Sequence, residues 1–228
     1  MIRSAHRRSP AGREARVLET GLAEMGLSLE PPVHQRLLSY IALLGKWNRV
    51  YNLTAVRKPE QMVTRHLLDS LSVLQFLREP RILDVGSGAG LPGIPLALAR
   101  PQWEFVLLDS NGKKARFLTQ AVAELGLSNV SVAQARVEEY QSEVLFTTII
   151  SRAFASVGEF VTGARHLLAP GGIYLAMKGA YPVAEMDHLP AGYAVVATHQ
   201  LQVPGLDAQR HAIELQPSEP AEAASGDT

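Results

Sequence analysis

The residues best suited to ligand chemistry are three alternating glycines, Gly86, Gly88 and Gly90, which directly follow an apolar run at residues 82–85. Glycine adopts positive φ angles and lets the backbone approach a ligand closely. The first turn after a strand lies at the carboxyl edge of a parallel sheet, where open α/β folds bind ligands. A tight turn without a ligand is the alternative, but three alternating glycines favour a binding turn.

Two carboxylates flank this turn and indicate the kind of ligand. Gly88, Gly90 and Gly93 satisfy the G-x-G-x-x-G spacing of dinucleotide-binding proteins, which is a weak signal on its own. Asp84, just before the turn, suits the charged amino-acid part of S-adenosylmethionine and would be poorly placed beside a pyrophosphate. Asp109 is spaced to accept both ribose hydroxyls. The turn therefore favours a methyl donor, and a nicotinamide-dependent oxidoreductase remains the alternative.

From residue 81 onward, short β-rich runs alternate with helical patterns, which predicts a parallel sheet with crossover helices. Helices are expected at residues 114–125, ending at Gly126, and in a segment that ends at Leu168. The expected parallel strands are residues 82–85, 105–108, 130–133, 148–150 and 173–177. Residues 194–197 and 211–215 are expected to form an antiparallel pair, because no helix fits between them. The expected fold class is α/β, a Rossmann-like class I methyltransferase with a mainly parallel seven-stranded sheet, a terminal antiparallel hairpin and an N-terminal helical extension.

Val137 and Glu138 follow the third expected strand and complete the expected cofactor site. They would frame the adenine through a backbone amide and a side chain. A surface carboxylate is an equally good interpretation of Glu138 alone.

The segment before the sheet has helical spacing. Apolar residues recur between Val33 and Leu44, and Pro59 suits the first turn of a helix that continues to Leu71. The expected organisation is a basic, partly mobile extension at 1–30, a helical subdomain at 31–78, the methyltransferase domain at 79–216 and a disordered acidic tail at 217–228.

Composition narrows the classes of function. The 228 residues suit one medium domain with an appendage, and no apolar run is long enough to span a bilayer. The start lacks the apolar stretch of a secretory signal, and without cysteine there is no thiolate metal site, so a cytoplasmic protein with no metal is expected. The formal net charge is zero, so any binding of nucleic acid must use a local basic surface.

A series of motifs resembles one family, the bacterial small-subunit ribosomal RNA guanine-N7 methyltransferases, also called glucose-inhibited division protein B. The resemblance runs from about Leu37 to Leu215, in order along the chain. The motifs are Lys46-Trp47-Asn48, Tyr51-Asn52-Leu53-Thr54, Arg65-His66-Leu67-Leu68-Asp69-Ser70, residues 84–95, Leu107-Leu108-Asp109-Ser110, Arg136-Val137-Glu138-Glu139, Ile150-Ser151-Arg152-Ala153-Phe154-Ala155, Lys178-Gly179, Leu201-Gln202-Val203-Pro204 and Arg210-His211.

The resemblance implies S-adenosylmethionine as cofactor and one guanine in the decoding-region loop of 16S rRNA as substrate, either in free rRNA or in the small ribosomal subunit. It implies that Gly86, Leu91, Val137, Glu138 and Arg152 contact the cofactor. The family commonly has an aspartate where this chain has Thr147, which puts a cofactor or structural role of that carboxylate in doubt. A monomer that does not bind membranes is expected.

Guanine N7 carries a lone pair and no proton, so its methylation needs no general base. Positioning should dominate, and no catalytic acid or base is assigned. Polar residues of the motifs are expected to hold RNA instead: Arg65, Lys178 and Arg210 on phosphate or guanine O6, Asn52 on a base edge, and His66 or Trp47 stacked on a base.

Each of these residues also has a structural interpretation. Arg65 and Asp69 are four apart on an expected helix and would pair. His66 would be a hydrogen-bonded core histidine, and Trp47 a core residue. A methyltransferase for another substrate and a non-catalytic binding module also remain as alternatives.

Overall fold

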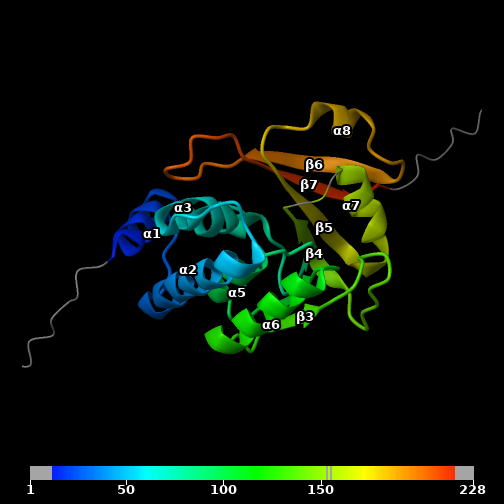
Figure 1. Ribbon diagram of the computed structural model, residues 1–228. Helices are drawn as coiled ribbons and strands as arrows, with labels where there is room; N and C mark the ends of the chain where they lie inside the picture. The colour runs from blue at the N-terminus through cyan, green and yellow to red at the C-terminus, as the bar shows by residue number, and fades with distance from the viewer. Residues whose placement is uncertain (1–11, 153, 155, 219–228) are drawn as a thin grey trace, which may run out of the picture.

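The computed structural model describes residues 12–152, 154 and 156–218. Residues 1–11 of the expected N-terminal extension and residues 219–228 of the expected acidic tail lie outside these residues. Figure 1 shows a central sheet with helices α1, α2 and α3 together on one side and α7 and α8 near the opposite end.

The sheet has seven strands in the order β3-β2-β1-β4-β5-β7-β6. The first five pair in parallel, and β7 pairs antiparallel with both β5 and β6. The strands are β1 (Arg81–Val85), β2 (Glu104–Leu108), β3 (Val130–Ala133), β4 (Phe146–Ser151), β5 (Leu168–Lys178), β6 (Tyr193–Gln200) and β7 (His211–Pro217). The expected fold class, with its terminal hairpin, is confirmed.

The two faces of the sheet are buried in separate apolar clusters. Consecutive residues alternate between them, as strand geometry requires: Ile149 packs into one cluster and Ile150 into the other. One face lies under α5 (Gly93–Ala99), α6 (Gly112–Leu125) and the N-terminal helices. The other lies under α7 (Val157–Gly163).

The N-terminal helices are α1 (Arg13–Glu24), α2 (Pro31–Tyr51) and α3 (Pro59–Met62). After α3 the chain continues through a π-helical turn, η1 (Val63–Leu68), into α4 (Asp69–Leu71). Such π-turns shift the direction of side chains and are frequent at functional sites. α1 lies in the extension that was expected to be partly mobile. It buries Leu18 and Leu22 and places Gly21 where a Cβ would meet Leu68.

The expected helix does not extend to Leu168, so its predicted C-terminal boundary is wrong. α7 stops at Gly163, the 3-10 turn η3 (Arg165–Leu167) follows, and β5 begins at Leu168. β5 therefore runs through Pro170-Gly171-Gly172, before the expected strand at 173–177. Two other short helices are η2 (Leu74–Phe76) and α8 (Val183–Asp187). None of the helices in the described part of the chain has the length and hydropathy needed to cross a bilayer.

Candidate functional site

The glycine turn is held open at the carboxyl ends of β1 and β2. The amides of Gly86 and Ser87 donate to the carbonyl of Leu108 at 2.8 and 3.1 Å. Gly86 and Gly88 have φ of +71° and +58°, so side chains are disfavoured at both positions. A Cβ on Gly86 would meet nothing within 4 Å. The backbone there borders open space, as a close-approach turn requires.

Asp84 lies below this turn with its side chain fully buried. Its Oδ2 accepts the amide of Gly93 at 2.9 Å, at the start of α5, while its Oδ1 has no hydrogen-bond partner among the described residues. Burial raises the pKa of this carboxyl to about 7. A buried carboxylate oxygen without a donor is costly, so Asp84 is suited to receive a cationic group.

Asp109 joins the turn to the next loop. Its Oδ2 accepts the Gly88 amide at 2.8 Å and its Oδ1 accepts the Asn111 amide at 2.8 Å. Lys114 Nζ lies 3.8 Å from Oδ2. Each carboxylate oxygen accepts more than one hydrogen bond, so Asp109 can hold the turn and still accept hydroxyl groups.

The other expected cofactor residues differ in exposure. Leu91 and Val137 are 3% and 5% exposed. Glu138 is exposed, and its Oε1 lies 3.1 Å from where a Cβ on Gly163 would be, so its carboxylate faces α7. Leu91 and Val137 would supply apolar walls, and Glu138 has the position of a surface carboxylate near the site.

The residues around the turn fit S-adenosylmethionine. The orphaned oxygen of Asp84 suits its ammonium group, Asp109 suits its ribose hydroxyls, and the open space at Gly86 admits the chain between them. This donor set is acidic where a pyrophosphate would need cationic or amide groups.

A cavity of about 340 Å³ brings together most of the residues expected to bind RNA. Arg65, His66, Lys178 and Arg210 all line it, together with Arg152, which had been assigned to the cofactor. Its walls come from η1, from the carboxyl ends of β4 and β5 and from the segment before β7. We call it the cationic pocket, after its four cationic side chains: Arg65, Arg152, Lys178 and Arg210.

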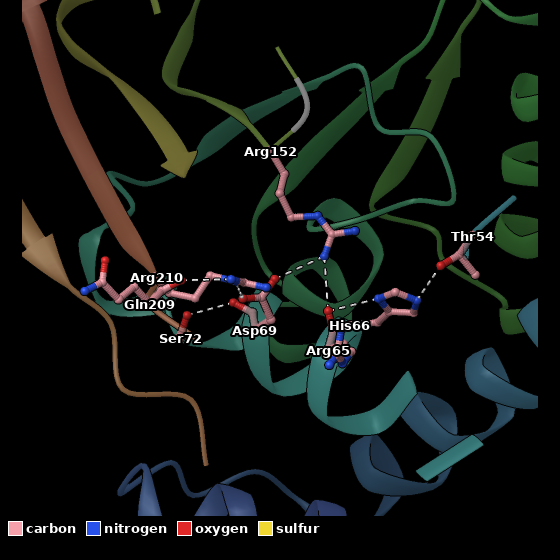
Figure 2. A network of polar contacts seen from close by, with 8 residues as sticks. All are labelled: Thr54, Arg65, His66, Asp69, Ser72, Arg152, Gln209 and Arg210. Carbon is pink, nitrogen blue, oxygen red and sulfur yellow. Dashed lines mark hydrogen bonds and ion pairs between the residues drawn. The ribbon is translucent and has the colours of Figure 1, made fainter. Parts of the chain in front are cut away.

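Figure 2 shows the network that organises this pocket around Asp69. The Asp69 carboxylate is 2% exposed; its Oδ1 accepts Nε of Arg210 at 2.8 Å and its Oδ2 accepts Nη1 of Arg152 at 3.1 Å. Arg152 also donates to the carbonyl of Arg65 at 3.3 Å. One buried carboxylate thus holds two arginines that lie far apart in the sequence, one just after β4 and one just before β7.

The expected pairing of Arg65 with Asp69 does not occur. Asp69 is taken by Arg152 and Arg210, and the exposed Arg65 side chain makes no hydrogen bond or ion pair with any described residue. The π-turn places Arg65 away from Asp69, because it breaks the regular i to i+4 spacing. Arg65 is therefore free to meet a ligand.

His66 is buried and held at both ring nitrogens. Nδ1 lies 2.9 Å from the carbonyl of Arg65 and must donate to it, and Nε2 lies 2.9 Å from Oγ1 of Thr54, whose hydroxyl then donates. Burial, together with the nearby charge of Arg152, lowers the pKa of His66 to about 4. His66 is neutral at pH 7 and has the geometry of the core histidine given as its alternative.

Asn52 and Trp47 do not line the cationic pocket. Asn52 is the left-handed C-cap of α2, and its Oδ1 accepts Nη2 of Arg57 at 2.7 Å. Trp47 is half-buried between Tyr51 and Phe117, with ring centroids at 5.1 and 5.5 Å.

Lys178 ends β5 at the pocket, as its position after an apolar strand predicted. Its Nζ lies 3.0 and 2.9 Å from the two carboxylate oxygens of Glu185 in α8. Glu185 also accepts the amide of Val157 at 2.7 Å. The lysine is thus held in place by an acidic partner that sequence analysis did not identify.

Thr147 lies at the other edge of the sheet. Its hydroxyl bonds the carbonyls of Arg78 and Arg81 at 2.7 and 2.9 Å and accepts the amide of Arg81 at 3.1 Å. It ties the segment before β1 to β4 at the amino end of both strands. Thr147, at the position where the resemblance leads us to expect an aspartate, therefore makes a structural contact away from the glycine turn.

Two buried residues that sequence analysis passed over support the site. Tyr40 of α2 donates its hydroxyl to the carbonyl of Ala89 at 2.6 Å, which ties the N-terminal helices to the glycine turn. Burial raises the pKa of its hydroxyl, so it remains a donor. Asp69 was considered only as a partner of Arg65. In the sequence, Tyr40 is a polar residue on an otherwise apolar helix face, and this pattern could have indicated a buried hydrogen bond.

Known proteins agree with this architecture. Residues 33–213 match the family model GidB, described as rRNA small subunit methyltransferase G. The chain is 54% identical over 201 residues to ribosomal RNA small subunit methyltransferase G of Nitrosococcus oceani, covering 88% of this chain and 94% of that protein. The protein of the same name in Chromohalobacter salexigens is 55% identical over 202 residues, covering 89% and 96%.

Solved structures share the fold at low identity. The glycopeptide N-methyltransferase MtfA, in complex with S-adenosyl-L-methionine, superposes with a TM-score of 0.55 at 14% identity, covering 68% of this chain and 88% of that one. A ribosomal protein L11 methylase from Lactobacillus delbrueckii gives a TM-score of 0.52 at 12% identity, covering 67% and 77%.

The sheet order, the glycine turn and its two carboxylates define a class I S-adenosylmethionine-dependent methyltransferase. Within that class, the chain belongs to the rRNA small subunit methyltransferase G family. Membership removes the nicotinamide-dependent oxidoreductase as an alternative.

Proposed function

We propose that this protein transfers a methyl group from S-adenosylmethionine to N7 of one guanine in the decoding-region loop of 16S rRNA. The observation that carries the proposal is the cationic pocket, which opens at the carboxyl ends of β4 and β5, in the same sheet edge as the glycine turn. Its relatives carry names that refer to the small-subunit ribosomal RNA.

The charge of the pocket suits a polyanion. Four cationic side chains line it, and Asp69 is the only carboxylate among its lining residues. The whole chain has no net charge, so this concentration is local. Arginine forks bind phosphate and guanine O6 through paired N–H donors. Arg65, with no partner among the described residues, is the first candidate for such a contact.

The chemistry of the pocket suits an acceptor that needs no base. His66 is neutral with both nitrogens engaged, and both oxygens of Asp69 are engaged by arginines. S-adenosylmethionine supplies an electrophilic methyl group when bound. Guanine N7 offers a lone pair without losing a proton, so the residues of this chain have only to hold the base in line. Such positioning contributes roughly 7–11 kcal/mol in favourable systems.

Each cofactor residue would hold a different part of S-adenosylmethionine. Asp84 would hold the ammonium end and Asp109 the ribose hydroxyls, with Leu91 and Val137 as apolar walls and Glu138 at the rim. The proposed enzyme acts as a monomer in the cytoplasm, on free 16S rRNA or on the small ribosomal subunit.

Methyl transfer to ribosomal fractions tests the proposal. Small subunits and 16S rRNA are prepared from a strain that lacks this protein and incubated with it and tritiated S-adenosylmethionine. Incorporation into one guanine, mapped by mass spectrometry of nuclease fragments as N7-methylguanine, is the expected result. Methylation of another atom or another RNA would contradict it, and binding of the cofactor with no transfer to any RNA would indicate a non-catalytic module.

A further inference from the structure

A groove of about 710 Å³ lies among the N-terminal helices, outside the cationic pocket. Its floor is apolar and includes Ala15 of α1, Leu38 and Ile41 of α2 and Met62 of α3. Three cations line it: Lys46, Arg49 and Arg57. All three are exposed, and Glu14 is the one carboxylate among the lining residues. We call this site the basic groove.

The segment that forms the rim is strongly cationic. Residues 46–58 hold Lys46, Arg49, Arg57 and Lys58 and no aspartate or glutamate, although the chain as a whole is neutral. Like charges this close repel one another, so the arrangement favours an anionic ligand. An apolar floor with a cationic rim matches a nucleotide, whose base is flat and whose phosphate is charged.

An exposed aromatic residue lies in the same segment as the rim, outside the residues that line the groove. Tyr51, at the end of α2, is 43% exposed, and its ring stacks on Trp47 with centroids 5.1 Å apart. Trp47 in turn packs on the buried Phe117. The two aromatic rings therefore pack toward Phe117 of α6, and the groove itself offers an apolar floor and a cationic rim.

The basic groove and the cationic pocket share one short loop. Asn48, itself buried, donates to the carbonyl of Val56 at 3.2 Å and accepts the amide of Thr54 at 2.9 Å. Arg57 is held by the carbonyl of Asn48 at 3.1 Å and by Asn52 at 2.7 Å. Val56 lines the cationic pocket and Arg57 lines the groove. Adjacent residues of one rigid loop therefore form walls of both sites.

We propose that the basic groove is a second RNA-binding site, which takes an unpaired base and its phosphates from the same RNA whose guanine enters the cationic pocket. The inference rests on the proposed function. In this site Asn52 is a positioning residue, because its Oδ1 accepts a hydrogen bond from Arg57 and so orients that side chain. The chain's own residues 1–11 are a poor occupant, because Arg3, Arg7 and Arg8 carry the same sign as the rim.

Gly45 offers a test that leaves folding intact. It lines the groove within α2, and a Cβ there would meet nothing within 4 Å. Glutamate is also a better helix former than glycine. Gly45→Glu places a carboxylate in the groove four residues before Arg49. Ser39→Glu makes the same charge change at an exposed position of α2 that does not line the groove, and serves as the control.

The expected result is a roughly tenfold rise in KM for RNA with Gly45→Glu, because the new carboxylate repels the phosphates, with kcat and the Kd for S-adenosylmethionine unchanged. Ser39→Glu should leave all three near their natural values. Direct binding of a 16S rRNA fragment, measured by fluorescence anisotropy, should weaken in parallel. This binding assay needs no methyl transfer, so it separates failure of the groove from failure of the proposed reaction.

Three results would overturn the inference. Equal effects of the two substitutions would mean that only net charge matters. Weakened binding to small subunits with unchanged binding to naked rRNA would place a ribosomal protein in the groove. Tighter RNA binding after deletion of residues 1–11 would mean that the chain's own start occupies it.

Discussion

Arg210 and Asp69 lie 141 residues apart in the sequence, yet Nε of Arg210 is 2.8 Å from Oδ1 of Asp69. The other oxygen of Asp69 is 3.1 Å from Arg152. The carboxylate therefore joins the N-terminal helical segment to the end of β4 and to the segment before β7 (Figure 2). The buried carboxylate would be left with uncompensated charge if either arginine turned away. Asp69 therefore determines the orientation of both arginine side chains.

We expect Asp69→Asn to lower kcat/KM for RNA methylation by roughly tenfold or more, because a hydrogen bond to a charged group is worth about 1.5–3 kcal/mol. Nonspecific RNA binding should not fall, since the substitution removes a negative charge from the pocket. Steady-state kinetics and filter binding to an unrelated RNA measure the two effects.

Ser72→Ala is the matched control for Asp69. The Ser72 hydroxyl donates to the backbone carbonyl of Asp69 at 2.7 Å and leaves the carboxylate alone. It should cost some stability and little activity. If both variants lose activity in proportion to their loss of thermal stability, Asp69 supports only the fold.

Gly86→Val should abolish binding of S-adenosylmethionine, because the side chain would enter the open space beside the turn. Gly126→Val is a matched control. Gly126 also has a positive φ, +59°, and no atom within 4 Å of its Cβ position, but it lies at the end of α6, away from the turn. Both substitutions carry similar backbone strain, on the order of 1–3 kcal/mol. Calorimetric titration should show lost binding for Gly86→Val alone, and unchanged affinity in that folded variant would remove the turn from the site.

Asp109→Ala should weaken S-adenosylmethionine by about 1.5–3 kcal/mol, the usual value of hydrogen bonds to a charged acceptor. It also releases the amides of Gly88 and Asn111, so a modest loss of stability is expected. Asn111→Ala removes the N-cap of α6 and keeps Asp109, which should cost about 1 kcal/mol of stability without a comparable loss of affinity. A far larger loss for Asp109→Ala would point to misfolding.

Local sequence pattern predicts the strands, the glycine turn and the cap of α6. The strands were placed because apolar β-rich runs are short and bounded, and Gly126 was placed as a cap because its αL conformation suits glycine. The glycine turn followed from the same logic. Lys178 was assigned to the ligand edge because it ends an apolar strand.

The parts that were missed depend on contacts between distant segments. Asp69 meets Arg210 rather than Arg65 because a π-turn, which no sequence spacing indicated, shifts the helix. α1 was not predicted, since its arginines suggested a mobile end, whereas Leu18 and Leu22 bind it to the core. β5 continues through Pro170 and two glycines because neighbouring β4 pairs with Leu168.

Asp84 should make both stability and cofactor affinity depend on pH. Its pKa is raised to about 7 when folded, against about 3.9 when unfolded. Between these values the folded state binds more protons, so the free energy of unfolding falls as pH rises. His66, with its pKa lowered to about 4, acts in the opposite direction below about 6.5.

Comparison with Asp84→Asn isolates the carboxyl, because His66 is present in both proteins. The melting temperature of the variant minus that of the natural protein should increase from about pH 5 to about pH 8. An ammonium group beside Asp84 favours the ionised form, so affinity for S-adenosylmethionine should rise from about pH 6 to 7.5 in the natural protein and stay flat in the variant. Parallel pH profiles in calorimetric titration would exclude Asp84 from the ammonium site.

Lys178→Ala should leave S-adenosylmethionine binding intact while weakening RNA binding and reducing the slope of log affinity against log salt by about one phosphate contact. The lysine is only 16% exposed and is held by Glu185 at 2.9 Å, so its position at the pocket is fixed before RNA arrives. Glu185→Gln keeps the lysine but removes its neutralising charge, and should maintain or strengthen RNA binding. Full methyl transfer by Lys178→Ala across a salt titration would show that the RNA does not pass over the carboxyl end of β5.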